Sequence, residues 1–91
     1  MQRIYKYPLT ITVYQTIGLP WGAQILSVQS QGPQLCIWAL VDPRREEKAY
    51  TVRIVGTGQE CDDLDGDDYV GTVQQGPMVW HVFFVHSTEA A

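Results

Sequence analysis

Short runs of β-branched and aromatic residues recur along the whole chain, separated by glycine, proline and acidic clusters. No segment repeats its apolar residues at the helical spacing of about 3.6 residues, whereas apolar and polar positions alternate in several places. The pattern predicts strands over Arg3–Tyr7, Leu9–Tyr14, Gln24–Gln29, Leu35–Val41, Tyr50–Ile54, Tyr69–Gln74 and Met78–Val85. We therefore predict an all-β fold, a small antiparallel barrel or sandwich of six to seven short strands ordered by sequential hairpins.

Two stretches of the chain are alike: SVQSQGP, residues 27–33, and TVQQGP, residues 72–77. Each precedes a long apolar strand that contains a tryptophan. We expect two hairpins of similar construction, in which glycine supplies a positive φ and proline opens the return strand where no ladder donor is needed. Six aligned positions are too few to establish a duplication, so coincidence is the preferred explanation.

Both return strands, Leu35–Val41 and Met78–Val85, are apolar on both faces. In an antiparallel sheet with one solvated face, apolar and polar residues should alternate. Either loops cover the outside of a closed barrel, or the second face is buried against another subunit. We favour a subunit, because so short a chain has little left to cover that face. The expected assembly is a homo-oligomer, with another protein as the alternative partner, and the expected interface residues are Trp38, Trp80, His81 and Phe83.

Length and charge narrow the class of protein. Ninety-one residues make one domain, 1–91. Six of the ten acidic residues lie in the segment 60–68, which we call the acidic loop; outside it, four acids face six bases. No basic stripe is present, so nucleic-acid binding is not supported. No apolar run approaches the ~18 residues of a membrane helix, and the N-terminus lacks an apolar signal core. We expect a protein of the cytoplasm or of a phage particle, with a frayed tail at 86–91.

The acidic loop is rich in the carboxylates that bind calcium, but its spacing does not match that of an EF-hand loop. Setting the glycine of an EF-hand at Gly66 places Cys61 at the first ligand position and Thr72 at the last, so both anchor carboxylates are missing. A looser oxygen-ligand site remains as an alternative to a solvated loop, which we favour; its ligands would be Asp63, Asp65 and Asp67. We therefore expect no metal.

A zinc site or a catalytic role would each require His81. His81 and His86 are five positions apart, so on one regular strand they point to opposite faces and cannot converge on zinc with Cys61. No nucleophile motif accompanies His81, and we favour a structural role for it over that of a general base. The expectation is a protein that is not an enzyme, with no catalytic residue and no cofactor. Cys36 and Cys61 are expected to be free thiols.

Trp21 is the one aromatic residue predicted to lie in a loop. We expect it to plug one end of the fold; the alternative is an exposed anchor for a partner or a sugar. With Gln74 and Gln75, and with His81 as a further candidate, it would then form a small-ligand or carbohydrate site, provided that these side chains converge on one concavity.

The stretches LPWGAQILSVQSQ, LCIWALVD, IVGTG and YVGTVQQGPMVWHVF resemble an uncharacterised family of short phage and bacterial proteins, of about 90 residues. The resemblance covers nearly the whole chain and implies a single compact domain of phage or bacterial origin. It carries no assigned activity. The sequence therefore favours a non-enzymatic structural or interaction module that self-associates, with a small-ligand or carbohydrate-binding domain as the alternative.

Overall fold

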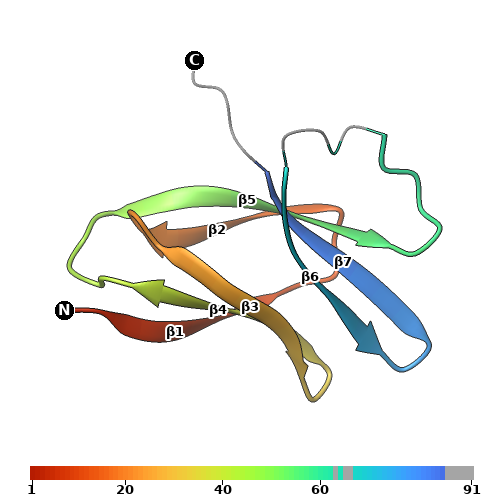
Figure 1. The fold of residues 1–91 in the computed structure, drawn as a ribbon, viewed down its shortest axis with the longest axis horizontal. Coiled ribbons are helices and arrows are strands. Elements are labelled where there is room, and N and C mark those ends of the chain that lie inside the picture. The colour runs from red at the N-terminus through yellow and green to blue at the C-terminus, as the bar shows by residue number, and fades with distance from the viewer. Residues whose placement is uncertain (63, 65–66, 86–91) are drawn as a thin grey trace.

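The protein is a sandwich of two antiparallel sheets (Figure 1). The structure, a computed structural model, describes residues 1–62, 64 and 67–85. Its strands are β1 (Arg3–Leu9), β2 (Tyr14–Pro20), β3 (Gln24–Gln31), β4 (Gln34–Val41), β5 (Glu47–Gly56), β6 (Asp68–Gln75) and β7 (Met78–Val85). Sheet A has the order β1-β4-β3 and sheet B the order β2-β5-β7-β6. The all-β prediction is confirmed, and of its two architectures the sandwich is the one observed.

The strand order differs from the prediction. Only β3–β4 and β6–β7 are hairpins of consecutive strands, whereas β1 pairs with β4, β2 with β5 and β5 with β7. The expectation that sequential hairpins set the order is therefore wrong for the other three pairings. No described segment forms a helix of the length and apolar character needed to cross a membrane.

The two predicted Gly-Pro hairpins are confirmed. Gln31 pairs with Gln34 around Gly32, and Gln75 pairs with Met78 around Gly76. Gly32 has φ 61° and Gly76 has φ 57°, and a positive-φ glycine at the first of two loop positions is what a type II′ turn requires. The Gln75 Nε2 atom donates to the Pro33 carbonyl oxygen at 3.2 Å, so the two turns lie side by side at one end of the sandwich (Figure 1).

One predicted strand is misplaced. We expected a strand over Leu9–Tyr14, but β1 continues through Pro8 to Leu9, and residues 10–13 form a loop. Pro8 is tolerated because β1 is an edge strand. The Gln15 amide bridges the loop, since its Oε1 accepts from the Thr10 backbone N–H at 3.0 Å and its Nε2 donates to the Thr10 carbonyl at 2.6 Å.

The core lies between the sheets and is made by alternate positions of the central strands. Leu35 and Ile37 of β4 face Val52 of β5 and Val82 of β7, and each of these side chains is at most 1% exposed. The predicted alternation on β4, β5 and β7 is therefore confirmed. Burial of such side chains contributes about 1.5–3 kcal/mol each.

The two sheets meet where β3 passes β6. A Cβ atom on Gly71 would lie 2.9 Å from Cγ1 of Val28, so only glycine allows this approach. Next to this contact, on the side away from the hairpin turns, a bulge interrupts each strand ladder. The bulge on β3 lies between Ile25 and Ser27, and the bulge on β6 lies between Tyr69 and Gly71. The extra residues, Leu26 and Val70, each lie six positions before the turn glycine of their hairpin. Because bulges bend strands, the matching pair shapes both walls between β3 and β6.

The loop between β4 and β5 is held by Asp42. Its carboxylate accepts from the Arg44 backbone N–H at 3.1 Å and from the Arg44 guanidinium at 3.0 Å. These bonds hold the pKa of Asp42 well below its ordinary value. The folded pKa is depressed, so this contribution to stability is present above the ordinary carboxyl pKa and is lost as the pH falls.

We expect an NMR titration to place the Asp42 carboxyl below the range of ordinary aspartates, and Arg44→Ala to return its pKa toward that range, because the main donor is removed. The exposed Arg45 provides a matched Arg45→Ala control that should leave the Asp42 titration unchanged. An ordinary pKa for Asp42 in the wild-type protein would contradict this assignment.

Candidate functional site

His81 lies on the outer face of sheet B, between two threonines. Its Nε2 atom is 2.8 Å from Thr57 Oγ1, and its Nδ1 atom is 3.0 Å from Thr72 Oγ1, which in turn contacts the Tyr69 hydroxyl. A hydroxyl both donates and accepts, so either tautomer of the imidazole is satisfied. The arrangement ties the loop after β5 to β6 and β7 through one half-buried side chain.

The acidic loop contributes to the cover over this face. Cys61 and Leu64 line a hollow of about 240 Å³ together with Val55, His81 and Phe83 of the outer face. Cys61 is a free thiol, as is the buried Cys36, which confirms that prediction. Thus the chain itself covers part of the outer apolar face of β7. From the sequence we favoured another subunit over loops as the cover of this face.

The alternative oxygen-ligand site, which we did not favour, cannot be placed in full. Asp63, Asp65 and His86 lie outside the described residues, as does the tail 86–91. Within the described part of the chain, no three His, Cys, Asp or Glu side chains are grouped as metal ligands would be.

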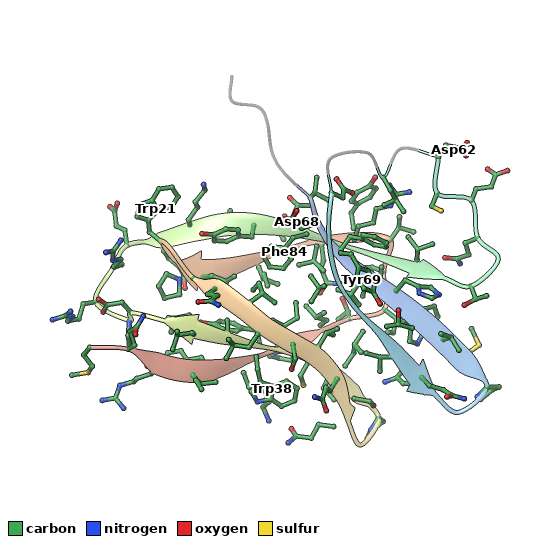
Figure 2. All side chains as sticks on the ribbon, in the orientation of Figure 1. Trp21, Trp38, Asp62, Asp68, Tyr69 and Phe84 are labelled. Carbon is green, nitrogen blue, oxygen red and sulfur yellow. The ribbon has the colours of Figure 1, made fainter. Side chains whose placement is uncertain are left out.

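The four expected interface residues do not share a surface. Trp80 lies on the inner face of β7, packs against the core and donates its Nε1–H to Gln75 Oε1 at 3.0 Å. His81 and Phe83 lie on the outer face of sheet B. Trp38 lies on the outer face of sheet A, at the lower edge of the view in Figure 2.

The outer face of sheet A carries an apolar stripe along β4. Cys36, Trp38 and Leu40 form it, because the alternate residues of β4 face the core. Next to Leu40 on β1 is Ile4, whose side chain is 60% exposed. Lys6 Nζ donates to Gln31 Oε1 at 2.6 Å, which joins the two edge strands of the sheet across this face.

Sequence reasoning missed a groove between β3 and β6. It has a volume of about 670 Å³ and opens beyond the contact between Val28 and Gly71. Its lining includes Ile25 and Leu26 of β3, Lys48 and Tyr50 of β5, Tyr69 of β6 and Phe84 of β7. Asp68 also lines it, and Figure 2 shows Asp68, Tyr69 and Phe84 grouped near the middle of the molecule. The apolar alternation of these strands was visible in the sequence, but the pairing of the two bulges was not.

Trp21 does not plug the fold, because its side chain is 52% exposed. That expectation was wrong. The Lys48 ammonium lies 4.2 Å from the centre of the Trp21 ring, and the backbone N–H of Trp21 donates to the Glu46 carbonyl at 2.8 Å. Trp21 therefore stands in the turn between β2 and β3, held beside Lys48 at the edge of the groove.

Gln74 and Gln75 lie at the opposite end, next to the turn between β6 and β7 (Figure 1). Gln74 is exposed. The Gln75 amide is engaged with Trp80, Ser30 and Pro33, and so links the two hairpins. The structure does not bring these glutamines together with Trp21 on one concavity.

No curated protein and no solved structure is significantly similar to this chain. A family model described as a domain of unknown function, DUF7352, matches residues 1–91. The match spans every strand of both sheets, the acidic loop and the tail. The chain therefore belongs to the DUF7352 family of domains of unknown function.

Proposed function

We propose that this domain is a non-enzymatic structural module that pairs with a second copy of itself through the outer face of sheet A. The observation that carries the proposal is a difference between the two outer faces. Cys61 and Leu64 of the acidic loop lie against the outer face of sheet B. On sheet A, the long side chains of Lys6 and Gln31 cross the apolar stripe. Cys36 in this stripe is buried, Trp38 and Leu40 are half-buried, and Ile4 beside them is 60% exposed.

The composition of this face fits an interface. A tryptophan and aliphatic side chains occupy its centre, and the ammonium of Lys6 and glutamines of β3 lie around them. Interfaces have such an apolar centre, enriched in tryptophan, within a polar rim. A second copy would meet it by a two-fold axis, so that the same patch is used on both chains.

The area of the outer face of sheet A determines how strongly two copies are expected to bind. Three strands of about seven residues cover roughly 23 Å by 14 Å, which is about 330 Å² of flat area. Two such faces make about 660 Å² in a pair, which is less than the ~1,200 Å² at which stable specific interfaces begin. The dimer is therefore expected to be weak and to form in the micromolar range, with exchange between one and two copies as the concentration changes.

A structural role agrees with the bonding of His81, whose two ring nitrogens serve to join Thr57 and Thr72. The resemblance to short phage and bacterial proteins supports a phage or bacterial origin, and we propose that the module acts in the cytoplasm or within a phage particle. The genes beside it test this part: capsid or tail genes support a particle role, and replication genes contradict it.

Trp38→Lys is expected to abolish pairing, since it places a charge at the centre of the buried patch. Ile4→Lys is a second variant, and it should fold as the wild type does, because Ile4 is 60% exposed. The matched control is Val13→Lys, which changes an exposed apolar side chain in the loop after β1. Light scattering after size exclusion should show concentration-dependent pairing for the wild type and Val13→Lys, and single chains for the other two. Pairing of wild-type strength in both face variants would refute this interface.

A further inference from the structure

The groove between β3 and β6 holds a cation in a fixed place. Lys48 Nζ lies 4.2 Å from the Trp21 ring centre and 5.5 Å from that of Tyr50. Aromatic faces attract an ammonium at such distances, so the two rings hold the end of a side chain that would otherwise be free to rotate. The result is a positioned positive charge at one wall of the groove.

Beside this charge lies an aromatic floor. Tyr50 and Phe84 have ring centres 5.8 Å apart, and both line the groove. Leu26 of β3 stands on one wall and is 45% exposed. Val70 of β6 lines the other wall. The groove volume of about 670 Å³ falls within the usual range of small-molecule sites.

Lys48 is the cation among the described residues that line the groove. Asp42 forms ion pairs with Arg44 and with the N-terminus, and neither pair includes Lys48. Asp68, which also lines the groove, has an interaction of its own. Lys48 is thus available to a ligand anion.

We propose that this groove binds a small amphipathic anion, whose flat apolar body lies on Tyr50 and Phe84 and whose single acidic group meets Lys48. Charge complementarity selects the class, because an apolar body alone leaves the ammonium without a counter-ion. The groove is separate from the outer face of sheet A, so the test of ligand binding does not depend on whether the protein self-associates.

Anilinonaphthalene sulfonate is a direct probe, since it combines aromatic rings with one sulfonate. We expect one probe to bind per chain with increased fluorescence. Lys48→Gln should weaken binding about three- to tenfold, the effect of one partly solvated charge pair. Leu26→Asp, which adds a negative charge to the wall of the groove, should weaken it further. The matched control is Lys6→Gln on the outer face of sheet A, which should bind as the wild type does.

The neutral analogue phenylnaphthylamine separates the charge from the apolar contact. It should bind the wild type and Lys48→Gln equally, because it has no acidic group for Lys48 to meet. Circular dichroism of each variant checks that the sheets are intact, since partly folded chains also bind such dyes. Equal sulfonate binding by the wild type, Lys48→Gln and Leu26→Asp would overturn the proposal. Loss of binding in Trp38→Lys alone would also overturn it, by placing the probe on sheet A.

Discussion

Trp80→Ala is expected to lower the free energy of unfolding by about 3–5 kcal/mol, the usual cost of truncating a packed tryptophan. The ring packs against the core, and a Cβ atom on Gly56 would lie 3.1 Å from it. Its loss also removes the N–H donor to Gln75 Oε1. Since a domain of this size is typically stable by about 5–10 kcal/mol, the variant should be close to unfolding. Urea denaturation followed by circular dichroism measures the change.

Trp80→Phe separates packing from hydrogen bonding. It keeps an aromatic ring in the core but leaves the Gln75 oxygen without its donor, so a smaller loss of about 1–2 kcal/mol is expected. If Trp80→Ala cost no more than Trp80→Phe, the ring would not contribute to the core, and its assignment to the inner face of β7 would be wrong.

Gly71→Ala is expected to destabilise the fold by about 1–3 kcal/mol, the cost of overpacking a close contact. The added methyl group would lie 2.9 Å from Cγ1 of Val28, a stiff β-branched side chain on the other sheet. The contact joins β3 to β6, so relief requires the two sheets to separate slightly. Thermal and urea unfolding of the variant measure this cost.

A double-mutant cycle tests that contact directly. Val28→Ala alone should also destabilise, because it leaves a cavity at a buried position. In Gly71→Ala/Val28→Ala the new methyl group occupies part of that cavity, so the combined loss should be smaller than the sum of the two single losses. Strict additivity would show that Gly71 and Val28 do not meet as described.

Local chemistry made most strands predictable. Alternation placed β4, β5 and β7 correctly, and two Gly-Pro dipeptides marked both hairpins, because type II′ turns depend on residues adjacent in sequence. The segment after Leu9 failed because alternation alone could not show that the Gln15 amide closes a loop over Thr10. Strand order failed for a similar reason, since pairings such as β1–β4 join segments far apart in the sequence.

The surfaces were harder to predict than the strands. The sequence correctly showed that β4 and β7 are apolar on both faces, but it assigned Trp38, Trp80 and His81 to one interface. Whether Trp80 points into the core depends on which side of β7 faces the other sheet, and alternation does not settle that choice. The groove beside Lys48 depends on two bulges at matching positions, which become neighbours only when β3 passes β6.

Sedimentation equilibrium of the wild-type protein tests the proposed pairing most directly. The account predicts a mass that rises with concentration from one chain of 10.3 kDa toward two, with the transition in the micromolar range. A single-chain mass maintained up to millimolar concentration would contradict it.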